Sequence, residues 1–116
     1  LKLFDADVVA LQEVDEVAML PFFKTQLEAL GYVGTYKKRT GDKPDGLALF
    51  WKKAAFDLVD APLGLQYRRP DIPVLDRDNV ALMVALRSTS NPKRMVVVAT
   101  THLLVREEKA ALVVLL

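Results

Sequence analysis

The chain contains no cysteine in its 116 residues, so disulfide frameworks, thiolate metal sites and thiol nucleophiles are excluded. A metal site would have to use oxygen or imidazole ligands, and the sequence offers a single histidine, His102. Apolar runs such as Met95 to Ala99 have the length of strands and are too short to span a membrane. We therefore expect an intracellular, cytoplasmic protein that does not associate with a membrane.

An excess of either charge is also lacking. The 16 basic and 15 acidic residues leave a net charge of +1, which by itself points to no class of partner. The chain starts on Leu1 rather than on a methionine, and it stops at Leu116 inside an apolar pattern without a capping residue. We expect residues 1–116 to be the N-terminal portion of a single domain that is truncated at both ends.

The periodicity of the apolar residues predicts an α/β chain. The run from Asp7 to Gln12 is nearly continuous and contains β-branched residues, as in a strand buried on both faces. From Glu16 to Leu30 the apolar residues recur with the helical period, and Gly31 is a natural stop. We also predict strands over residues 32–37, 47–52, 56–65, 80–86 and 95–100, loops over residues 37–46 and 66–78, and a second helix over residues 106–116.

Glu13 and His102 each follow a predicted strand. Open α/β sheets usually place their ligand crevice at such strand ends. Magnesium commonly takes one or two carboxylates from a protein, so Glu13 could be a metal ligand, or else a solvated side chain. His102 could hydrogen-bond a phosphate oxygen or move a proton, or else be a packing histidine whose nitrogens are paired with backbone. Position alone leaves both alternatives open.

Two loops carry most of the remaining polar residues of interest. The stretch from Lys37 to Gly46 contains four cations that could grip phosphates or simply be solvated. In the second loop, Arg68, Arg69 and Arg77 lie among aspartates. Ion pairs that hold this loop together are the favoured interpretation, and guanidinium groups presented to a polynucleotide are the alternative.

Four ordered blocks carry a resemblance to a known family: residues 6–14, 43–50, 75–81 and 98–104. Together they resemble the endonuclease/exonuclease/phosphatase superfamily, and the stretch Arg39-Thr40-Gly41 with the block from Leu75 to Val80 is most similar to the Angel branch of its CCR4 and nocturnin deadenylase-like group. The resemblance implies a DNase I-like four-layer α-β-β-α sandwich. We expect this chain to supply about half of it, as the strands of one mixed sheet with helices on the outer face.

The resemblance also implies roles for individual residues. It makes Glu13 the catalytic ligand of Mg²⁺, with Mn²⁺ as an alternative, and it makes His102 the group that binds the scissile phosphate. Thr100 stands where many members have asparagine. From the two middle blocks we expect four residues to bind substrate: Lys43, Asp45, Arg77 and Asn79.

The function implied is magnesium-dependent hydrolysis at RNA 3′ ends, either poly(A)-type 3′-5′ trimming or removal of a 2′,3′-cyclic phosphate. The family's early asparagine motif and its Asp-x-Asn and Ser-Asp-His motifs have no match in this sequence. We therefore expect the chain to need the remainder of the same domain and to be inactive alone. The alternatives are a phosphatase for inositol phosphates or phospholipids, and a non-catalytic RNA-binding relative.

Overall fold

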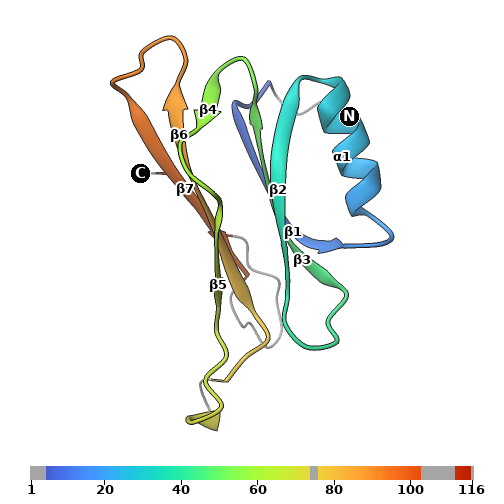
Figure 1. Cartoon of the computed structure of the whole chain (residues 1–116). Coiled ribbons are helices and arrows are strands. Elements are labelled where there is room, and N and C mark those ends of the chain that lie inside the picture. The colour runs from blue at the N-terminus through green and yellow to red at the C-terminus, as the bar shows by residue number, and fades with distance from the viewer. Residues whose placement is uncertain (1–4, 74–75, 103–111, 116) are drawn as a thin grey trace.

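The computed structural model describes residues 5–73, 76–102 and 112–115 of the chain (Figure 1). The first sheet has the strand order β1-β3-β2, and in the second sheet β4-β6-β7-β8 are neighbours while β5 also pairs with β6. All of the described pairings are antiparallel. The elements are β1 (Val8–Asp15), α1 (Leu20–Ala29), β2 (Tyr32–Lys38), β3 (Asp45–Lys52), β4 (Phe56–Leu58), β5 (Leu63–Gln66), β6 (Val80–Ser88), β7 (Met95–Thr101) and β8 (Leu112–Leu115).

The elements form three layers. Figure 1 shows α1 against one face of the β1-β3-β2 sheet, with the second sheet on the opposite side. Successive side chains of a strand point to opposite faces, and β3 uses both faces. Leu47, Leu49 and Trp51 pack against buried residues of β6 and β7, whereas Ala48 and Phe50 pack on the α1 side. Strand β3 therefore contributes to both hydrophobic cores.

The helix α1 starts later than the sequence predicts, because Asp15 organises the preceding turn. Its carboxylate accepts hydrogen bonds from the backbone nitrogens of Val17 and Ala18 at 2.9 and 2.7 Å. Proline at position 21 suits the first helical turn, where its missing N–H group needs no partner. The helix stops before Gly31, whose φ of +88° is readily adopted by glycine.

Three expectations about the arrangement of the elements are wrong. The strands belong to two sheets rather than one, because the residues that follow β3 pair with β6 and cover the inner face of the first sheet. Residues 112–115, expected to be helical, form β8 and pair with the end of β7, from Thr101 opposite Leu112 onward. The remainder of that predicted helix, residues 106–111 and 116, lies outside the described residues. The expected strand over residues 56–65 divides into β4 and β5.

The α/β fold class is nevertheless confirmed, because α1 packs on the outer face of one of two stacked sheets (Figure 1). Among the described helices, none combines the length and the apolar character that crossing a membrane requires.

Candidate functional site

Glu13 lies in a β-bulge of β1 rather than beyond the end of the strand, where the sequence predicts it. Leu11 pairs with Ala48 and Val14 pairs with Gly46, so two residues of β1 stand opposite the single position 47 of β3. The φ angle of Glu13 is +56°, in the left-handed region that a residue with a side chain rarely adopts. Its side chain is exposed. A strained backbone of this kind is common at functional sites.

His102 directly follows β7, as predicted, and is half-buried. Its Nδ1 atom is buried and has no hydrogen-bond partner among the residues that the structure describes. A histidine with a purely structural role would normally have a buried ring nitrogen paired. His102 therefore stays a candidate, and its role stays a prediction.

Gln12 connects the strands that carry these two residues. Its Nε2 atom donates a hydrogen bond to the carbonyl oxygen of Thr101 at 2.7 Å and a longer one to Thr100 Oγ1 at 3.4 Å. Gln12 precedes Glu13, and Thr101 precedes His102, so this contact brings the bulge of one sheet to the end of a strand in the other. Gln12 was not predicted from the sequence, although an amide in an otherwise apolar strand is a signal that could have identified it.

Thr101 is itself held by two neighbours. Its hydroxyl donates to the carbonyl oxygen of Val80 at 3.1 Å, and Tyr67 Oη lies 2.8 Å from the same Thr101 oxygen. Since the threonine hydroxyl has one hydrogen and uses it on Val80, Tyr67 is the donor in the second bond. Residue 81 pairs with Thr101, so Asn79 and His102 lie at the same end of the β6-β7 pair. The Oδ1 atom of Asn79 is also buried, without a partner in the described part of the chain.

Hydrogen bonds connect the loop between β2 and β3 to the loop that precedes β6. Thr40 donates its hydroxyl to Asp78 Oδ1 at 2.7 Å, and its backbone nitrogen donates to the Asp78 carbonyl at 3.1 Å. The Thr40 hydrogen bond, followed by the charges of Arg68 and Lys43, lowers the pKa of Asp78. Lys43 is exposed. Asp45, the first residue of β3, forms an ion pair with the Arg39 guanidinium at 3.3 Å.

The loop between β5 and β6 contains the ion pairs that the sequence favours. Arg68 contacts both carboxylate oxygens of Asp76 at 2.7 and 3.1 Å, and Arg69 lies 3.0 Å from Asp71. The Arg68 hydrogen bond lowers the pKa of Asp76. Arg77 instead donates to backbone carbonyl oxygens, at 2.9 Å for Asp76. The interpretation of this segment as a structured loop is therefore confirmed.

Negative charge gathers beside the bulge. Tyr36 donates its hydroxyl to the Val14 carbonyl oxygen at 2.7 Å. Burial, reinforced by the charges of Glu16, Asp45 and Asp15, raises the pKa of Tyr36 to about 12. Of these carboxylates, that of Asp45 is itself paired with the Arg39 guanidinium.

The donor chemistry fits a hard cation held by few protein atoms. No group of three or more acidic or histidine side chains able to hold a metal occurs within the described ranges. Magnesium usually keeps several waters and takes one or two carboxylates, with substrate phosphate as a further ligand. The exposed carboxylate of Glu13 fits one such position.

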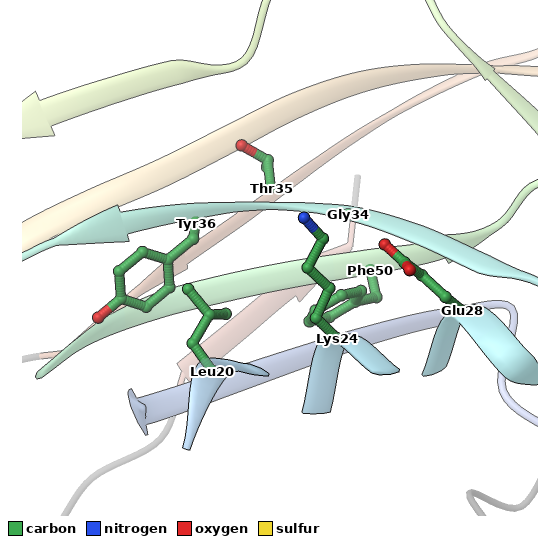
Figure 2. Close-up of a pocket in the computed structure, with 7 residues that line it drawn as sticks. All are labelled: Leu20, Lys24, Glu28, Gly34, Thr35, Tyr36 and Phe50. Carbon is green, nitrogen blue, oxygen red and sulfur yellow. The ribbon is translucent and has the colours of Figure 1, made fainter. Parts of the chain in front are cut away.

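A cavity of about 140 Å³ lies between α1 and β2, separate from these residues. Figure 2 shows Lys24 and Glu28 extending from the helix toward the strand at Gly34. Neither Glu13 nor His102 lines this cavity. The candidate site at the bulge and the end of β7 is therefore distinct from this cavity.

The chain is similar in sequence to several known proteins. The chain is 46% identical over 108 residues to Protein angel homolog 2 of Bos taurus, and 44% identical over 110 residues to the Homo sapiens protein, covering 90% of this chain and 19% of each relative. It is also 34% identical over 99 residues to Carbon catabolite repressor protein 4 homolog 3 of Arabidopsis thaliana. The chain thus spans about a fifth of the length of these relatives.

Among solved structures, the chain is similar to the crystal structure of ANGEL2, a 2′,3′-cyclic phosphatase, in complex with adenosine-2′,3′-vanadate. The TM-score is 0.79 at 46% identity, and the match covers 87% of this chain and 29% of that one. The model of the Endonuclease/Exonuclease/phosphatase family matches residues 1–114. The chain therefore belongs to the Endonuclease/Exonuclease/phosphatase family.

Proposed function

We propose that the domain containing this chain is a magnesium-dependent phosphoesterase that removes 2′,3′-cyclic phosphates from RNA 3′ ends. The observation that carries the proposal is the contact between Gln12 and Thr101, which brings the strand of Glu13 to the strand of His102. A metal-ligand carboxylate and a phosphate-binding imidazole at one end of two packed sheets suit metal-assisted hydrolysis of a phosphoester.

Each residue has a distinct role in this proposal. Glu13 holds Mg²⁺ or Mn²⁺, and the bound ion supplies positive charge that offsets the charge of the scissile phosphate. His102 donates a hydrogen bond to a phosphate oxygen. Asn79 accepts a hydrogen bond from the substrate through its buried Oδ1 atom, which lacks a partner in the described residues.

The cations of the two loops bind the RNA chain behind the reacting end. Lys43 is exposed and free to approach a phosphate, and Arg77 offers its guanidinium from the neighbouring loop. Asp45 contributes indirectly, because its ion pair with Arg39 shapes the loop that carries Lys43. Such contacts position RNA and carry little sequence specificity.

The cyclic-phosphate substrate is preferred over an adenylate tail because the solved ANGEL2 structure is that of a 2′,3′-cyclic phosphatase and holds adenosine-2′,3′-vanadate. Tail trimming remains the second candidate, because the four sequence blocks resemble the CCR4 and nocturnin deadenylase-like group. No described feature favours inositol phosphates or phospholipids. We also propose a cytoplasmic location, which the absence of cysteine suits.

The test uses the full-length protein and RNAs that differ only at the 3′ end. We expect Mg²⁺ to support loss of the cyclic phosphate and a chelator to stop it, while an oligoadenylate with a 3′ hydroxyl keeps its length. Shortening of the oligoadenylate with an unchanged cyclic end would establish tail trimming instead. Binding of RNA without hydrolysis of either substrate would establish a non-catalytic protein.

A further inference from the structure

We propose that Gln12 is a positioning residue that fixes Glu13 and His102 relative to each other across the two sheets. The inference rests on the proposed function, and it concerns a residue to which the sequence alone assigns no role. Its basis is the 2.7 Å hydrogen bond from Gln12 Nε2 to the Thr101 carbonyl oxygen, supplemented by the 3.4 Å contact with Thr100 Oγ1.

Gln12 joins an interruption in the pairing of one sheet to the last residue of a strand in the other sheet. Gln12 stands in the bulge, where the register between β1 and β3 is interrupted. Thr101 is the last residue of β7. Apolar contacts between the sheets are not directional, whereas a hydrogen bond fixes a donor and an acceptor in space. The amide of Gln12 therefore supplies the directional element of this junction.

The acceptor side of the junction is well anchored. Thr101 also bonds through its hydroxyl to the Val80 carbonyl oxygen and receives the hydroxyl of Tyr67. Thr100, whose hydroxyl lies within 3.4 Å of the Gln12 amide, is itself buried. Thr100, which stands where many members of the family have asparagine, thus still offers Gln12 a polar partner. Because Thr101 is held in this way, its hydrogen bond with the Gln12 amide fixes the bulge relative to the end of β7.

Loss of the donor should leave the packed sheets intact and displace the reacting groups. The buried hydrophobic residues that join the sheets come from β3, β6 and β7. Val8 and Ala10 of β1 pack against them, but Gln12 is not part of this cluster. A displacement of about 1 Å in a catalytic group can lower a rate by roughly 100-fold. The expected defect is therefore in the chemical step rather than in substrate binding.

The experiment compares three variants of the full-length protein on an RNA that ends in a 2′,3′-cyclic phosphate. Gln12→Met keeps the side-chain length without a donor, and Gln12→Glu keeps the shape but replaces the amide donor by an acceptor. Gln66→Met on the exposed strand β5 is the matched control. We measure kcat, KM and melting temperature, together with the NMR signal of the His102 imidazole, assigned by its disappearance in His102→Gln.

For both Gln12 variants we expect kcat to fall by about 10- to 100-fold, with KM changed by less than about twofold. The His102 signal should move, and Gln66→Met should match the wild-type protein in every measurement. A wild-type kcat, or an unmoved His102 signal, in folded Gln12→Met would overturn the proposal. If the wild-type protein hydrolyses no RNA end, the proposed function fails. The His102 signal then decides the positioning role alone: a moved signal supports it and an unmoved one overturns it.

Discussion

Thr40 and Asp78 hold two loops together through a pair of hydrogen bonds, one from the threonine hydroxyl at 2.7 Å and one from its backbone nitrogen at 3.1 Å. The first loop carries Lys43, and the second leads directly to Asn79 and β6. The two hydrogen bonds therefore fix the positions of the two loops, and of the residues proposed to bind RNA, relative to each other. This arrangement predicts a pH-dependent contribution to stability.

Replacing Thr40 by valine removes the hydroxyl donor, which is the main cause of the lowered pKa of Asp78. A carboxylate with a lowered pKa in the folded state stabilises the fold above its unfolded pKa, and the stabilisation is lost as the pH falls through the lowered value. We expect Thr40→Val to melt below the wild-type protein at neutral pH, and the difference to shrink in acid, below about pH 4. Thr25→Val on the exposed face of α1 is the control. A pH-independent difference would contradict this account.

Gly46 lacks a side chain because the neighbouring strand and Tyr36 occupy the space. A β-carbon there would contact the Lys37 carbonyl oxygen and lie 2.7 Å from Lys38 Cα and 2.8 Å from Tyr36 Oη. We expect Gly46→Ala to lower the free energy of unfolding by about 1–3 kcal/mol, measured by urea denaturation of the full-length protein.

The matched control for this prediction is Gly64→Ala. A β-carbon at Gly64 would meet the flexible side chain of Lys37 at 3.0 Å, which can move aside. We expect a much smaller change in the free energy of unfolding. Equal losses in both variants would show that the tight backbone contact at Gly46 is not the cause.

Glu13 combines a strained backbone with the proposed metal ligand. Both Glu13→Ala and Glu13→Gly remove the carboxylate and should abolish magnesium-dependent hydrolysis. Glycine adopts a φ of +56° without the clash that alanine suffers, so we expect Glu13→Gly to be more stable than Glu13→Ala by about 1 kcal/mol. Thermal melts and turnover assays of the same preparations check both statements. Unchanged turnover in either variant would remove Glu13 from the metal site.

Tyr36 should ionise later than an ordinary tyrosine, because burial and nearby carboxylates raise its pKa to about 12. The pKa of Tyr36 is higher in the folded state than the value of about 10 expected in the unfolded state. The stabilisation that follows is complete below the unfolded pKa, and it is lost as the pH rises through the folded pKa. The tyrosinate absorbance of the full-length protein should lose one late-titrating component in Tyr36→Phe. Tyr67→Phe is the control, and loss of the same late component in that variant would reassign it.

The sequence predicted the regular elements well where one-dimensional pattern and burial agree. The strand starting at Tyr32 and the strand starting at Met95 were predicted within one residue, because their side chains alternate or form a bounded apolar run. Glu13 and His102 were identified as candidates from their positions near strand ends and from the family blocks. The resemblance also gave the fold class, which composition alone leaves open.

What the sequence missed depends on contacts between distant residues. The bulge at Glu13 follows from pairing with β3, and the role of Gln12 follows from a partner 89 positions away. The final apolar segment satisfies a helical pattern equally well, and its pairing with β7 determines that it is a strand. Local propensity carries no information about such partners.

The bulge has an evolutionary consequence. Two residues of β1 stand opposite one position of β3 between Leu11 and Val14. If one of the two were deleted, β1 and β3 could pair there without interruption. Glu13 is thus carried on a position that folding does not require and that its own φ angle disfavours. In a lineage released from selection for the reaction, this position should be the first to drift or to be deleted, while Val14 and Gly46 persist.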